Sequence, residues 1–125
     1  MQDFKIRQLQ YESDTWKRTL GFMIEENIHL KNRIAEILKN GFDKSQLQEV
    51  EIFQSRFVKE DELISIMRNG VAEFDKLILR EIFKDGKLET NVSKKLSQLR
   101  HNITMAENEF SRLKQEFNSY LLSTV

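Results

Sequence analysis

Two histidines are the side chains in this sequence best suited to metal or phosphoryl chemistry. His29 ends a Glu-x-x-His element that begins at Glu26. This spacing places a carboxylate and an imidazole on one helix face in di-iron helical bundles. Such a centre also needs a second copy of the element, and the sequence has none. We therefore expect neither His29 nor His101 to bind a metal, and we expect no cofactor.

Both histidines also lie in short segments that loosely resemble phosphoacceptor motifs. His29-Leu30-Lys31-Asn32 is similar to the His-x-Leu-Lys-Gly pattern of histidine phosphotransfer domains, but it is one residue short and lacks the glycine. His101-Asn102-Ile103-Thr104 lacks the acidic residue and the proline of the sensor-kinase box. Short motifs often match by chance. A phosphotransfer module is therefore the least favoured alternative.

Other catalytic and binding classes lack their required residues. The sequence has no cysteine, no glycine-rich phosphate loop, and no serine on a tight turn near a histidine. Twenty basic residues balance twenty acidic ones without long runs of either sign, which argues against nucleic-acid binding. No segment has the length and apolarity of a membrane span or a secretory signal. We expect a cytoplasmic protein without catalytic activity.

The elements that position these side chains are predicted by apolar residues recurring in alternating steps of three and four. The clearest run has nine apolar residues, which are Val92, Leu96, Leu99, Ile103, Ala106, Phe110, Leu113, Phe117 and Tyr120. A second run spans 50–78 and is broken only by Glu60. A third spans 6–37 and includes the polar Ser13 and Asn27. This spacing places each run along one side of a helix.

Two glycine-containing breaks separate the runs, at Asn40-Gly41 and at Asp85-Gly86. Asn69-Gly70 could be a third break that splits the middle helix, yet the heptad phase continues through it. Proline is absent, which favours few and long elements. We therefore predict one all-α domain over 1–125, with helices over about 3–39, 44–84 and 88–122.

Three helices of similar length joined by short loops favour an elongated up-down-up antiparallel coiled-coil bundle. This layout resembles spectrin-like and other three-helix coiled-coil bundles, and the likeness concerns architecture alone. Folding the chain at its two glycine breaks predicts the core layers. One layer sets Trp16 beside Met67 and Ala106, and another sets Leu30 beside Phe53 and Tyr120.

Two polar residues in the predicted seams are candidates for a special role. Asn27 would fix the register or oligomeric state if it is buried, or would reach water at a loose layer. Glu60 is expected near Arg56 or Arg112, either of which could pair with it in a structural role.

Apolar residues outside the seams occur on the first two predicted helices far more than on the third. The candidate interaction surface comprises Phe22, Ile28, Ile52, Val58, Ile66 and Leu79. Its simplest partner is a second copy of the chain, because most oligomers are two-fold homodimers. We expect a structural or adaptor protein that acts through protein contacts. The alternative is a small-ligand carrier or sensor with a cavity near Trp16 and Ala106.

Overall fold

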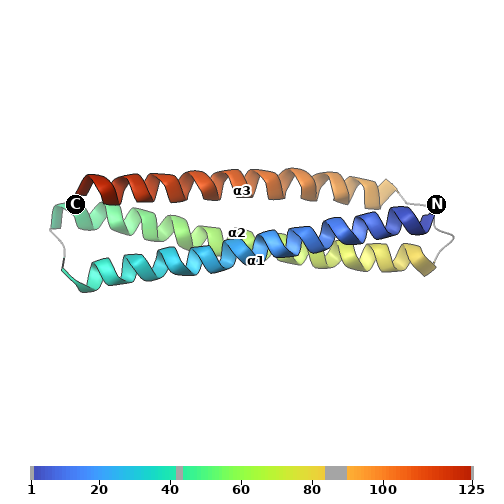
Figure 1. The fold of residues 1–125 in the computed structure, drawn as a ribbon, viewed down its shortest axis with the longest axis horizontal. Coiled ribbons are helices and arrows are strands. Elements are labelled where there is room, and N and C mark those ends of the chain that lie inside the picture. The colour runs from blue at the N-terminus through green and yellow to red at the C-terminus, as the bar shows by residue number, and fades with distance from the viewer. Residues whose placement is uncertain (1, 42–43, 84–89, 125) are drawn as a thin grey trace.

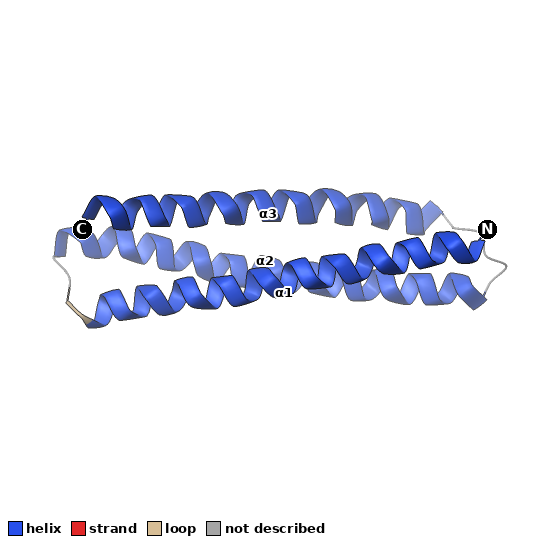
Figure 2. Cartoon of the chain, in the orientation of Figure 1, coloured by secondary structure: helices blue, strands red, loops and turns tan. Residues whose placement is uncertain are grey.

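The computed structural model describes residues 2–41, 44–83 and 90–124 and consists of three long helices side by side (Figures 1 and 2). Helix α1 spans Gln2–Lys39, α2 spans Lys44–Phe83 and α3 spans Thr90–Thr124. Helices α1 and α3 run in one direction and α2 runs back between their ends (Figure 1). The predicted all-α three-helix bundle is confirmed. Its expected stop at Asp85-Gly86 lies outside the described residues.

The ends and continuity of the helices follow from glycine placement. Gly41 has a φ of 89°, a left-handed conformation that glycine adopts without strain. It directly follows Asn40, whose backbone N–H donates to the Glu36 carbonyl at 3.0 Å. Gly70 lies inside α2 and does not interrupt it. The prediction of one continuous middle helix is therefore correct.

The core is a single stripe of apolar side chains buried between the three helices. It follows the predicted spacing along each helix, including Leu20, Ile34, Phe57, Ile64, Phe74, Ile103 and Phe117. Near the α1–α2 loop, the Phe117 ring packs against Phe53 and Phe57, with centroids 5.3 Å apart in both pairs. The Phe53 ring also lies 5.4 Å from Tyr120, so this part of the predicted layer is confirmed.

The predicted register between α1 and α2 needs a correction. The Trp16 ring packs against Phe74, with centroids 5.5 Å apart, whereas the predicted layer set it beside Met67. Phe74 lies two turns further along α2. The prediction placed the fold point at the Gly41 break, but cross-helix polar contacts described below pair α1 with later residues of α2.

Candidate functional site: polar layers and exposed apolar faces

A polar cluster near the start of α1 links it to the end of α2. The Ser13 hydroxyl donates to Oδ1 of Asp75 at 2.5 Å. Lys17 lies one turn after Ser13 and places its Nζ 2.6 Å from Oδ2 of the same carboxylate. The hydrogen bond to Asp75 raises the pKa of Lys17. One aspartate thus pairs with two side chains on successive turns of α1.

The same arrangement recurs at the middle of the bundle. The Asn27 amide Nδ2 donates to Oδ1 of Asp61 at 2.6 Å and to the Phe57 carbonyl at 3.0 Å. Lys31 lies one turn after Asn27, and its Nζ donates to Oδ2 of Asp61 at 2.5 Å. A polar seam residue and a following lysine again share one aspartate.

These two polar layers lie two heptads apart on both helices, and α3 contributes to each. The Arg100 guanidinium makes a bidentate pair with Glu12, the residue before Ser13, with N–O distances of 2.5 and 2.8 Å. Two heptads further along, Lys114 pairs with Glu26, the residue before Asn27. The aspartate contacts between α1 and α2 and the glutamate ion pairs between α1 and α3 both repeat after two heptads. The two layers therefore favour one alignment of the three helices along the bundle.

Sequence reasoning missed these layers, although the sequence carries their signal. Ser13 and Asn27 break the apolar run two heptads apart, and each is followed by lysine four residues later. Asp61 and Asp75 have the same separation on the second helix. A count of apolar heptad positions scores a polar residue in the seam only as a missing apolar residue. Here the polar residues recur every two heptads, which is also the spacing of the hydrogen-bonded layers.

Asn27 itself is fully buried, with 0% of its side chain exposed. The interpretation in which it reaches water at a loose layer is therefore wrong. Its Oδ1 has no hydrogen-bond partner among the described residues. Since the amide makes both of its bonds to α2, removing it would affect the α1–α2 pair more than the contact with α3.

The Glu60 side chain is buried in the seam between α2 and α3. Only 8% of it is exposed, and its Oε2 has no hydrogen-bond partner within the described part of the chain. Burial raises the pKa of Glu60, and the negative charge of Glu109 raises it further, while Arg56 lowers it. Arg56, an expected partner, instead donates to Glu116 at 2.6 Å.

Glu60 lines a shallow hollow of about 490 Å³ between α2 and α3, together with Glu109 and Arg112. Three cationic side chains border this hollow, namely Arg56, Lys59 and Arg112. A divalent cation would meet those positive charges, so two carboxylates in this setting do not make a metal site. We interpret the hollow as a gap in the packing of α2 against α3 beside the buried Glu60 carboxylate.

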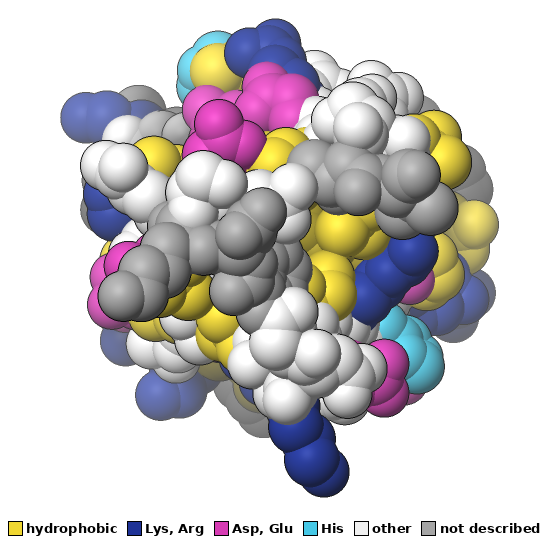
Figure 3. Space-filling model, turned by 90° about the vertical axis from the view of Figure 1, so that its left-hand side faces the viewer, with side chains coloured by type: hydrophobic (Ala, Val, Ile, Leu, Met, Phe, Trp, Pro, Cys, Tyr) yellow, Lys and Arg dark blue, Asp and Glu magenta, His cyan; other side chains and the backbone are white. Residues whose placement is uncertain are grey.

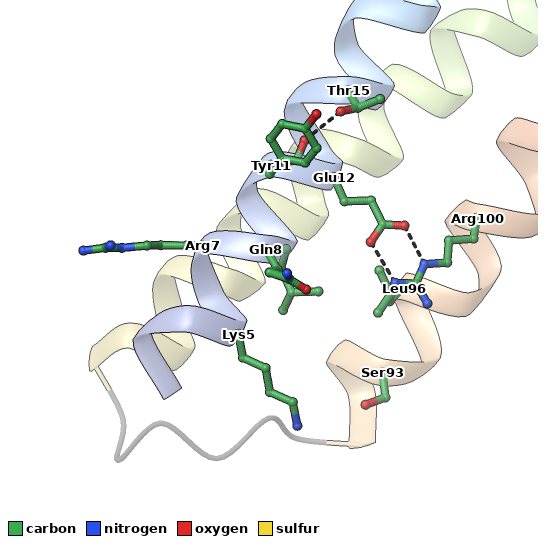
Figure 4. Close-up of a pocket in the computed structure, with 10 residues that line it drawn as sticks. Lys5, Arg7, Gln8, Tyr11, Glu12, Thr15, Ser93, Leu96 and Arg100 are labelled. Carbon is green, nitrogen blue, oxygen red and sulfur yellow. Dashed lines mark hydrogen bonds and ion pairs between the residues drawn. The ribbon is translucent and has the colours of Figure 1, made fainter. Parts of the chain in front are cut away.

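A second hollow lies between the N-terminal halves of α1 and α3 and measures about 830 Å³. Figure 4 shows Lys5 reaching toward α3 across its mouth, while Arg7 points away from it. Leu9 and Leu96 lie at its base, and the Glu12–Arg100 pair bridges its inner end. The Glu12 carboxylate and the Arg100 guanidinium satisfy each other, and Lys5 and Arg7 are the other charged side chains that line the hollow.

The two histidines lie on exposed positions of different helices. Within the described ranges, no three histidine, cysteine or acidic side chains are grouped as a metal site requires. The same ranges contain no helix with the length and apolarity needed to cross a membrane.

All six residues of the candidate interaction surface are exposed, and they lie on more than one side of the bundle. Phe22 lines a hollow between α1 and α3, beside Phe110 and Lys114. Leu79 instead lines one between α1 and α2, beside Asp75.

The remaining four occupy outer positions of α1 and α2. Ile28 and Val58 directly follow Asn27 and Phe57, which are hydrogen-bonded to each other, so both flank the α1–α2 contact. Ile52 and Ile66 lie two heptads apart on α2, on the side toward α3. Four of the six residues thus belong to α2, and the six do not form one patch.

Charged side chains of both signs occur at one end of the bundle. Viewed from the end that carries the α1–α2 loop, basic and acidic side chains both occur around the visible circumference, without a single-sign face (Figure 3). The four ion pairs Lys17–Asp75, Lys31–Asp61, Arg56–Glu116 and Lys95–Glu73 join α2 to its neighbours.

Comparison of the chain with protein-family models, curated proteins and solved structures finds no significant match.

Proposed function

We propose that this chain is a structural or adaptor protein that acts through protein–protein contacts, that it self-associates as a dimer in the cytoplasm, and that it has no catalytic activity. The observation behind this proposal is the uneven distribution of exposed apolar side chains. Among the described residues, five large ones lie on α2, which are Leu47, Ile52, Val58, Ile66 and Leu79. Helix α1 carries Tyr11, Phe22 and Ile28, whereas α3 carries Met105 and Leu122. Exposed apolar surface concentrated on two neighbouring helices of a small protein is typical of an interface.

The net charge of zero supports association with a like chain. Twenty basic and twenty acidic residues leave no long-range repulsion between two copies. Absence of cysteine accords with a cytoplasmic protein that depends on packing and not on disulfides.

Small-ligand binding has weaker support. The cavity expected for that function lay near Trp16 and Ala106, yet both side chains are buried in the core. The Trp16 ring is packed against Phe74, and the hollows described above are lined by other residues.

Light scattering coupled to size-exclusion chromatography tests self-association directly. We expect a mass that rises with loading concentration from that of one chain, 14.9 kDa, toward twice that value. A mass that stays at 14.9 kDa at the highest concentrations would remove self-association from the proposal.

A further inference from the structure

The outward face of α2 carries four large apolar side chains over its length. Ile52, Val58, Ile66 and Leu79 are all exposed, and Ile66 has 66% of its surface open to solvent. They occupy the two heptad positions that flank the outermost line of the helix. Small side chains lie among them at Ser55, Ser65, Asn69 and Ala72, and the charged Glu62 and Lys76 lie on the outermost line. This face therefore combines large apolar residues with room for a second helix to approach.

The inner sides of α2 are already occupied. Asp61 and Asp75 face α1, and Arg56 pairs with Glu116 on α3. The equivalent outward face of α3 is polar apart from Met105 and Leu122, with Ser97, Thr104, Asn108, Ser111 and Gln115. Of these two helices, only α2 offers an unpartnered apolar face.

A two-fold axis between Ser65 and Ile66 would make this face complementary to itself. An antiparallel second copy then sets Ile52 opposite Leu79 of that copy, and Ile66 opposite Ser65. Val58 falls beside Ala72 of the second copy. Because the operation is two-fold, each contact occurs twice.

The charges at the edges of the face agree with the same axis. Glu51 comes opposite Arg80 of the second copy, whereas Lys59 comes opposite Ala72 and lies one residue from the level of Glu73. All four charged side chains are exposed, and Glu73 also pairs with Lys95 on α3 within the single chain. The Glu51–Arg80 contact is repeated by symmetry, which gives two pairs of unlike charge, and Glu62 comes opposite the neutral Asn69.

Other alignments of the same face bring like charges together. Moving the axis toward the N-terminus of α2 by half a heptad places Glu62 against Glu62, and Glu51 against Glu73. A parallel pair in register would set Glu62 against Glu62 and Lys76 against Lys76. Like charges at an interface disfavour these arrangements.

We propose that two copies of this chain associate antiparallel through the outward face of α2, about a two-fold axis between Ser65 and Ile66. The proposal rests on the self-association proposed above and specifies its surface and geometry. The paired segment, 51–80, is about 45 Å long at 1.5 Å per residue. Helix α2 of each copy then lies at the centre of a six-helix assembly, with α1 and α3 on its far side.

Chemical cross-linking at single cysteines tests this geometry, because the native chain contains no cysteine. Ile52→Cys and Leu79→Cys variants are treated with a short bis-maleimide, separately and as a mixture. The mixture should give a covalent dimer in large excess over either variant alone, since two copies of position 52 lie about 40 Å apart in this arrangement. Ser65→Cys, next to the axis, should cross-link alone.

Ser97→Cys on the outward face of α3 is the matched control, and it should stay uncross-linked. Light scattering on each variant separates the possible failures. Strictly monomeric protein overturns the proposed self-association and this geometry together. A dimer that cross-links at Ser97→Cys, or that gives no excess product in the Ile52→Cys and Leu79→Cys mixture, overturns this geometry alone.

Discussion

The side-chain amide of Asn27 on α1 donates a 2.6 Å hydrogen bond to the Asp61 carboxylate on α2. The same nitrogen donates to the Phe57 carbonyl, one turn earlier on α2. A fully buried amide that makes both of these bonds to one neighbouring helix restricts how the two helices slide past each other. The Ser13–Asp75 bond does the same near the other end of α2.

A double-mutant cycle should detect this bond. We expect Asn27→Ala and Asp61→Ala to show a coupling free energy of roughly 1 kcal/mol in urea unfolding, because each variant removes the same contact. Asn27→Ala combined with Asp75→Ala provides the control, since these residues belong to different layers. Additive effects in the Asn27 and Asp61 pair would show that the bond contributes nothing to stability.

Glu60→Gln should stabilise the bundle at neutral pH. The folded-state pKa of Glu60 is raised, chiefly by burial, so the folded state holds the Glu60 proton more tightly than the unfolded state. Stability from this group is therefore present below its ordinary pKa and is lost as pH rises through the raised folded value. Removing the charge should add roughly 1 kcal/mol near pH 7, the order of cost for an unpaired buried polar group.

The pH profile distinguishes this cause from a general packing effect. The advantage of Glu60→Gln over the native chain should shrink as pH falls toward the ordinary glutamate range, when the native carboxyl becomes protonated. Urea unfolding at several pH values measures it. A constant difference between the two proteins at all pH values would contradict a raised pKa for Glu60.

Two helix-interior glycines should respond differently to alanine. A Cβ at Gly21 meets nothing within 4 Å, so Gly21→Ala should stabilise α1 by up to about 1 kcal/mol. A Cβ at Gly70 would lie 3.1 Å from Cδ2 of the buried Leu99, and crowding there should offset most of the same gain. Thermal unfolding of both variants checks this, and an equal gain at Gly70 would mean that α3 packs less closely than described.

Reversing the charge of Glu51 or Arg80 should weaken the proposed dimer, and reversing both should restore it. Glu51→Arg and Arg80→Glu should each weaken dimerisation by roughly tenfold, because each replaces two attractive exposed pairs with repulsive ones. The double variant restores unlike charges and should recover most of the native affinity. Dilution series followed by light scattering give the three constants, and a double variant weaker than either single one would argue against this pairing.

Much of the fold could be predicted because apolar periodicity determines which side of a helix is buried. The seam residues from Val92 to Phe117 and the helix end at Gly41 follow from local sequence alone. Periodicity does not fix register, because an antiparallel pair shifted by one heptad buries the same stripes. Trp16 consequently packs on Phe74, since Ser13, Asn27 and their aspartates determine the alignment.

The candidate surface could be predicted only in part, for a related reason. Exposure of Phe22 and Ile66 follows from their positions off the seam. Which exposed residues share a face depends on how the helices are arranged around the axis. Phe22 is therefore separated from Ile66, although both are apolar residues outside their seams.

The central claim is that two copies of this chain associate through α2. Sedimentation equilibrium of the native chain and of two glutamate variants tests it. We expect the native chain to approach twice 14.9 kDa with rising concentration. Ile66→Glu should remain at the mass of one chain, while Met105→Glu on α3 should behave as the native chain. A native chain that stays at 14.9 kDa, or an Ile66→Glu variant that dimerises as well as Met105→Glu, would contradict it.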